Sequence, residues 1–364
     1  MKKAATRPTA PRSVTPLLLA CATVVLGACA PGGHGASDRS RSAALAEPEA
    51  FSLLDRRPFR QPVFTPERRR ALEGDLAAAR AAFDADPASE EASIWVGRRL
   101  AYLGRHREAV EWYTRALERF PESPRLLRHR GHRFITLRRF DEAFSDLERA
   151  ATIVLERGIP DEVEPDGAPN ASGAPRSTLH SNIQYHLGLA AYLRGEFARA
   201  ALVWDNAVRT MAMNDDTLVA FAYWRFNART RLGHETVAMS ELEGIRPDMD
   251  ILENFAYHRL LLVFKGERSE AWALDAARAP GVGGGGAVDD ATTSYGLANR
   301  RLTRFDLAGA TALMERLVAS DQWAAFGFIA AEVDLVRLRR GELNPEPATP
   351  GADDTIRQWQ RQRR

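Results

Sequence analysis

The chain has 364 residues, 27% of them charged, and a formal net charge of +2. A balance this close to neutral argues against nucleic acid as a partner, because nucleic-acid binding needs a strongly basic surface. Cys21 and Cys29 are the only cysteines, which is too few for a disulfide framework or a multi-cysteine metal site.

Residues 1–28 are typical of an export signal peptide. They contain four cations, no acidic residue and a mostly apolar run over 17–28. That run is shorter than the roughly 20 residues that a helix needs to cross a bilayer, and a positive segment before a short apolar one is typical of a cleaved signal. Its removal would leave a charge near 2 − 4 = −2 on the rest of the chain.

The end of this run, Leu26-Gly27-Ala28-Cys29, resembles the lipobox of bacterial lipoproteins. The resemblance implies cleavage before Cys29 and lipidation of its thiol. Ala30 follows, which implies sorting to the outer membrane of the cell envelope, facing the periplasm. Because each buried methylene contributes about 0.8 kcal/mol, several acyl chains would form a strong anchor. The alternative is a plain secretory signal with an incidental cysteine.

Two further segments are expected to lie outside the fold. Residues 29–63, rich in Gly, Ser, Ala and Pro, are predicted to form a flexible linker. Residues 341–364, rich in proline and charge, are predicted to form a disordered C-terminal tail. The folded domain is therefore expected over 64–340. Its first helix should cover 65–86, with Thr65 as the N-cap and Pro66 as the first helical residue.

Small residues recur at a fixed interval after this helix. The first set is Gly97, Ala109 and Ala116. The second set lies 34 positions later, since 131 − 97 = 34, and consists of Gly131, Ala143 and Ala150. A period of about 34 residues is typical of helical hairpins that stack on their neighbours as a solenoid.

The pattern resembles that of tetratricopeptide repeats, which have Gly or Ala at position 8, Ala at 20, an aromatic residue at 24 and Ala at 27. The repeat from Glu90 has Gly97, Ala109, Tyr113 and Ala116, and Pro121 closes it. The repeat from Pro124 has Gly131, Ala143, Leu147 and Ala150. A third, from Ser181, has Gly188, Ala200, Trp204 and Ala207. Weaker matches continue to a sixth repeat, and residues 323–338 are expected to form a capping helix.

The resemblance implies an all-α fold, a solenoid of about five to six helical hairpins. Small residues at positions 8 and 20 would lie where the two helices of a hairpin cross, because larger side chains push helix axes beyond the usual separation of about 8–10 Å. The aromatic residue at position 24 is expected to fill the gap toward the next repeat. Segments 128–133, 164–167, 177–182 and 323–328 also resemble a group of exported bacterial repeat proteins, which implies no activity.

The repeat register is lost between residues 155 and 181. Segment 158–178 contains four prolines and three glycines and cannot be one helix, so an inserted loop is predicted over 158–180. Loops this long are usually functional or disordered, and the sequence leaves open whether this one is a recognition element or a linker. The glycine-rich segment 281–286 lacks the Gly-Lys-Ser/Thr of a phosphate loop and is expected to be a flexible connection.

The resemblance also assigns partner-binding residues, because the first helices of tetratricopeptide repeats line a concave groove. The residues at the corresponding positions are Arg98, Tyr102, Arg128, His132, Asn182, Tyr185, Tyr223, Asn227, Tyr295 and Asn299. These side chains would hold an extended peptide or its carboxylate by charged hydrogen bonds. The family's carboxylate clamp, with asparagine at position 9 of successive repeats, is not reproduced.

Histidines provide an alternative. His129 and His132 are neighbours on one helix face, and a loop folded over the groove would add Asp166, His180 and His186. A metal site needs three or four converging ligands, which spacing alone does not establish. The sequence therefore predicts a lipid-anchored periplasmic scaffold that binds a protein or peptide, with no catalysis and no cofactor. A metal-dependent enzyme or small-molecule binder, and a structural spacer without a ligand, stay open.

Overall fold

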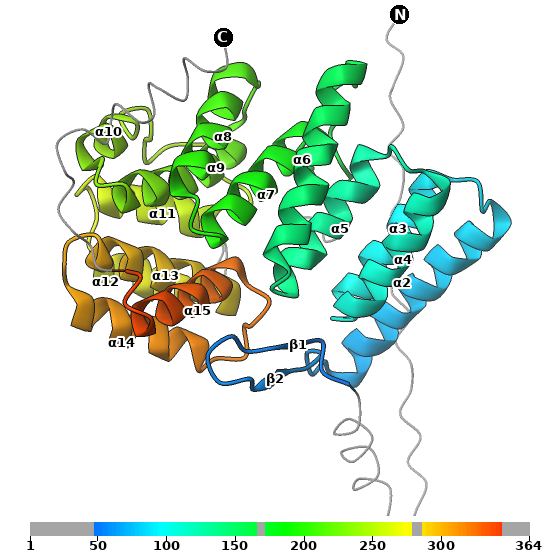
Figure 1. The fold of residues 1–364 in the computed structure, drawn as a ribbon, viewed down its shortest axis with the longest axis horizontal. Coiled ribbons are helices and arrows are strands. Elements are labelled where there is room, and N and C mark those ends of the chain that lie inside the picture. Colours follow the sequence, from blue (N-terminus) through cyan, green and yellow to red (C-terminus); the bar gives the residue numbers. More distant parts are fainter. Residues whose placement is uncertain (1–46, 166–171, 279–285, 344–364) are drawn as a thin grey trace, which may run out of the picture. The chain divides into compact units, whose positions relative to one another are not determined.

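The computed structural model describes residues 47–165, 172–278 and 286–343 (Figure 1). The predicted signal peptide, Cys29, Asp166 and residues 344–364 of the predicted tail lie outside the described residues, so what was predicted for them stays a prediction. None of the described helices is long and apolar enough to span a membrane.

The described part of the chain is helical apart from one short β hairpin, β1 (Ala50–Phe51) and β2 (Pro58–Phe59). The helices are α2 (Pro66–Ala85), α3 (Glu90–Tyr102), α4 (His106–Arg119), α5 (Pro124–Thr136), α6 (Phe140–Arg157), α7 (Leu179–Leu193), α8 (Phe197–Thr210), α9 (Asp215–Arg231), α10 (Glu235–Ser240), α11 (Phe255–Phe264), α12 (Glu270–Arg278), α13 (Ala287–Leu302), α14 (Leu307–Val318) and α15 (Phe326–Arg339). They pack as successive hairpins, from α3 with α4 to α13 with α14, and α15 packs on the last pair (Figure 1). The predicted all-α fold of helical hairpins is confirmed.

The helix ends follow the local signals. Thr65 is the N-cap of α2, where its hydroxyl accepts a hydrogen bond from the backbone N–H of Arg68, and Pro66 occupies the first position. α4 stops at Arg119, shortly before Pro121, because proline has no N–H for the helical ladder. The predicted first helix and the predicted stop at Pro121 are both confirmed.

The small residues at repeat position 8 lie at the helix crossings. A Cβ added to Gly97 or to Gly188 would come within 2.3 Å of the Tyr113 or the Trp204 ring. The residue at position 24 therefore packs on position 8 of its own hairpin, and the aromatic ones also contact the next repeat, as predicted. Tyr113 does both, since its ring also stacks on His129 of the next hairpin at 5.8 Å.

The prediction of a flexible linker is wrong for residues 47–63. The β hairpin pairs Ala50 with Phe59, and the Phe59 ring stacks on Trp323 at 5.3 Å. Next to this pair, the carboxylate of Glu49 accepts a 2.9 Å hydrogen bond from the backbone N–H of Arg107 in the first turn of α4. No side chain of α4's own N-cap satisfies that helix end. This segment lies between α4 and α15 and belongs to the fold.

In the second half of the chain, the first helices of the hairpins pack closely together. α13 contacts α9 as well as α11, and α15 contacts both α13 and α7. The faces that would line an open groove there are therefore turned toward other helices. This arrangement decides which predicted groove residues a partner can reach.

Candidate functional site

Four of the predicted groove residues are inside the protein. Tyr223 and Asn227 on α9 are 0% exposed, and Tyr295 and Asn299 on α13 are at most 1% exposed. The expectation that these four side chains line an accessible groove is wrong, because α13 and α15 pack over the inner face of α7 and α9.

These buried side chains belong to a polar network that joins four helices. The Tyr295 hydroxyl bonds to that of Tyr192 at 2.6 Å and donates to Asp334 at 3.0 Å. Arg231 donates two hydrogen bonds to the Asp334 carboxylate, at 2.9 and 3.0 Å, and one to Asn299 at 3.1 Å. Buried polar groups that satisfy one another in this way specify how helices pack, so the network has a structural role.

Tyr185 is also engaged inside the protein. Its hydroxyl bonds to that of Tyr257 at 2.7 Å and accepts a 2.8 Å hydrogen bond from the indole N–H of Trp224. The remaining five predicted groove residues lie together. Arg98, Tyr102, Arg128, His132 and Asn182 line a cavity of about 230 Å³ between α3, α5 and α7.

This cavity is strongly cationic, and we call it the arginine pocket. Its charged and imidazole lining consists of Arg98, Arg128, Arg133, His129, His132, His186 and Glu164. Glu164 is the one carboxylate among these lining residues, against three arginines, so the pocket carries an excess charge of 3 − 1 = +2 with neutral histidines.

The inserted loop reaches the pocket through Glu164. α6 ends at Arg157, and its C-cap Gly158 is in the left-handed conformation. The loop is held by a bridge between Val163 and Thr178. Glu164 is 5% exposed; its carboxylate pairs with Arg128 and accepts a 2.5 Å hydrogen bond from Asn182. The described parts of the loop are thus packed on the pocket, which favours the recognition-element interpretation over the linker.

The three pocket histidines are uncharged at neutral pH. Burial, with Arg128 next in effect, holds the pKa of His129 well below its usual value. Burial also lowers the pKa of His186 to about 3 and that of His132 well below its usual value. The Arg128 guanidinium can only donate, so its 2.8 Å contact with His129 Nδ1 puts the His129 proton on Nε2. That nitrogen faces the second Glu164 oxygen at 3.8 Å.

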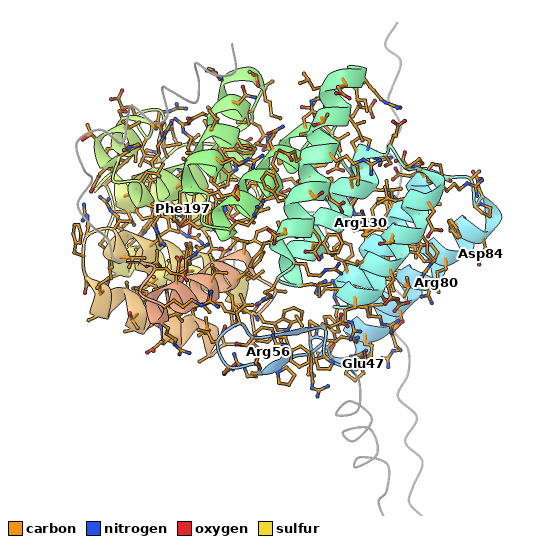
Figure 2. All side chains as sticks on the ribbon, viewed as in Figure 1. Glu47, Arg56, Arg80, Asp84, Arg130 and Phe197 are labelled. Atoms are coloured by element: carbon orange, nitrogen blue, oxygen red, sulfur yellow. The ribbon has the colours of Figure 1, made fainter. Side chains whose placement is uncertain are left out.

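Arg133 is one of the two pocket arginines, with Arg98, that have no carboxylate partner among the described residues. On the same helix, Arg125 pairs with Glu91, Arg128 with Glu164 and Arg130 with Asp146 (Arg130 is labelled in Figure 2). The side chain of Arg133 has neither a hydrogen bond nor an ion pair within the described part of the chain. Burial lowers its pKa to about 10, and the neighbouring Arg128 and Arg98 act in the same direction.

The structure brings together only part of the predicted histidine site. The rings of His132 and His186 lie 4.4 Å apart, but His180 lies beside Asp161 at the start of α7, with 3.8 Å between Nδ1 and Oδ1. Among residues 47–165, 172–278 and 286–343, no group of three His, Cys, Asp or Glu side chains is arranged to hold a metal ion. The surrounding guanidinium groups would also repel a cation.

Two important pocket residues were missed from the sequence. Arg133 is at repeat position 10, outside the positions that the family uses for its groove, and Glu164 lies in the insertion where no register exists. One signal was present: the α5 segment Pro124–Thr136 has four arginines and no acidic residue, so its charge has to be balanced from elsewhere.

Comparison with solved structures finds several similar chains. A tetratricopeptide repeat protein from Parabacteroides merdae is similar to this chain at 13% identity and a TM-score of 0.41, over 73% of this chain and 94% of that protein. No family model matches the chain, and none of the curated proteins matches it.

Proposed function

We propose that the chain is a non-catalytic scaffold, lipid-anchored in the cell envelope, that binds a protein or peptide partner at the face around the arginine pocket. The proposal is supported by the fold, since stacked helical hairpins present extended binding surfaces. It is also supported by the position of the pocket on the first helices of three successive hairpins, α3, α5 and α7. No cofactor is part of the proposal.

One observation carries the binding role: Arg98 and Arg133 line the pocket without a carboxylate partner among the described residues. Arg98 lies over the Trp95 ring at 4.4 Å and makes only a long contact of 3.4 Å to the Tyr102 hydroxyl. Charged groups in such surroundings are usually paired. A partner with acidic groups would provide the missing ion-pair partners for both arginines.

The metal-dependent alternative has less support. His129 Nδ1 already accepts from Arg128, and its other nitrogen carries the proton, so this ring offers no lone pair to a metal in the observed arrangement. The pocket's excess positive charge opposes a cation as well. A small anionic ligand is compatible with the same charges.

The binding role is tested by affinity capture from detergent-solubilised membranes, with captured proteins quantified by mass spectrometry. We expect Arg133→Glu to lower recovery of the partner at least about tenfold, because like charges facing each other across an interface cost several kcal/mol. The matched control is Arg115→Glu, a charge reversal at an exposed position of the outer helix α4, which should retain the partner. If Arg133→Glu recovered as much partner as the unchanged protein does, recognition would have to lie on another surface.

The anchoring role is tested separately with Cys29→Ser. The unchanged protein should incorporate labelled palmitate and fractionate with the outer membrane, because its acyl chains bury many methylenes. The variant should incorporate none and appear in the soluble periplasmic fraction. A variant that still sediments with membranes would show that another feature holds the chain there.

A further inference from the structure

The arginine pocket has the size of a site for one small chemical group. Its volume of about 230 Å³ is below the range of about 300–1,000 Å³ that is usual for drug-sized ligands. An extended peptide segment would not fit inside it, although such a segment could cover its mouth. What enters must therefore be compact.

The charges of the pocket indicate which group that is. Among the residues that the structure describes, Arg128 is the one arginine of the three with a carboxylate partner, Glu164. Arg98 and Arg133 come from adjacent inner helices, α3 and α5, and both line the same cavity. Two guanidinium groups in one small cavity repel each other unless an anion lies between them, and planar guanidinium groups match the oxygen pairs of carboxylates and phosphates.

Glu164 shows that the cavity accepts a negatively charged oxygen. One of its oxygens bonds to both Arg128 and Asn182, while the other, Oε1, is buried and has no hydrogen bond to any of the described residues. A neutral donor is also present, the Tyr102 hydroxyl, which accepts from Arg98 and can donate its own proton.

We propose that the arginine pocket binds one compact oxyanion, a carboxylate or phosphate group of a small molecule, between Arg98, Arg128 and Arg133 and next to Glu164. The site goes beyond the proposed scaffold role, since it needs no protein partner. Glu164 limits its affinity, because a second negative charge beside it is repelled. The inserted loop that carries Glu164 thereby sets how tightly the anion is held.

The test is isothermal titration calorimetry on the full purified chain at constant ionic strength, with inorganic phosphate and succinate as separate probes and chloride as the background ion. We expect saturable binding of at least one probe. Arg133→Gln should weaken it at least about tenfold, because it removes a charged hydrogen-bond donor to the anion. Arg115→Gln, on the exposed face of α4, should bind as the unchanged protein does. The probe that binds more tightly identifies the oxyanion class.

Glu164→Gln provides a second, independent readout, because it keeps an oxygen acceptor for Asn182 while removing the charge. It should bind the same probe at least about fivefold more tightly. Circular dichroism establishes that each variant is folded. The proposal is overturned if neither probe binds saturably, if Arg133→Gln binds unchanged, or if Glu164→Gln binds no more tightly. Because partner capture is measured separately, a failure of anion binding does not decide whether the chain is a scaffold.

Discussion

At the scale of single residues, the hairpins depend on glycines that are required for space rather than for backbone freedom. Gly188 lies inside α7, and a Cβ there would come within 2.3 Å of the Trp204 ring. Trp204 is 0% exposed, so its ring has no room to retreat. Gly74 in α2 provides the contrast, because no atom lies within 4 Å of its added Cβ.

We therefore expect opposite effects from the same substitution. Gly188→Ala should lower the free energy of unfolding by about 1–3 kcal/mol, the usual range for overpacking a core. Gly74→Ala should raise it by about 0.5–1 kcal/mol, because alanine is the better helix former. Chemical denaturation of both variants measures the difference, and a neutral Gly188→Ala would mean that α7 and α8 can shift apart.

The repeat register determines which residues of the site could be predicted from the sequence. Arg98, Arg128 and His132 were found because the repeat register places them on first helices. Tyr223 and Asn299 satisfy the same register but are buried, since a register says which face of a helix a residue occupies and not what packs against that face. Glu164 could not be placed, because the inserted loop follows no period.

At the scale of elements, the turn inside each hairpin contains one residue in the left-handed conformation. Gly104 has a φ of 77°, and the residue 34 positions later, Arg138, has a φ of 63°. Glycine adopts this conformation without strain, whereas arginine does so at a cost. Phe305, in the turn between α13 and α14, is a second non-glycine residue in this conformation, with a φ of 66°. For Arg138 the contacts give a reason, since it donates to Glu332 at 3.0 Å and to the carbonyl oxygen of Trp323 at 2.8 Å.

The repeat period predicted the paired helices well because each hairpin is held by contacts within one repeat. The period did not predict the structure of segments whose contacts come from residues outside their own repeat. The segment 47–63 has the composition of a linker, yet Phe59 is 4% exposed because Trp323 and Phe328 cover it. Its packing depends on residues far along the chain, which a local reading of composition does not include.

At the scale of the whole described fold, the first and last segments contact each other. Figure 1 shows the β hairpin beside α15, and the backbone N–H of Leu53 donates to the Glu332 carboxylate at 3.0 Å. The other Glu332 oxygen accepts from Arg138 between α5 and α6. The side chains of this ion pair are 3% and 1% exposed, so a single carboxylate joins three parts of the chain.

Removing this carboxylate should destabilise the fold strongly. Glu332→Ala should lower the free energy of unfolding by about 3–5 kcal/mol, because it leaves the Arg138 charge buried and unpaired. Glu315→Ala, at an exposed position of α14, should change it by less than about 0.5 kcal/mol. In urea denaturation the double variant Arg138→Ala/Glu332→Ala should lose less than the sum of the two single variants, and additive losses would argue against a coupled pair.

The contact between Leu53 and Glu332 spans 279 positions, which has a consequence for the order of events during synthesis. A ribosome releases Leu53 long before Glu332 exists, so the β hairpin lacks its contact with α15 until every intervening helix has been made. An array of repeats with free ends can begin folding as soon as its first neighbours emerge. Here the last described helix completes the packing of the β hairpin, and a chain truncated before Glu332 would leave the hairpin without its contact to α15.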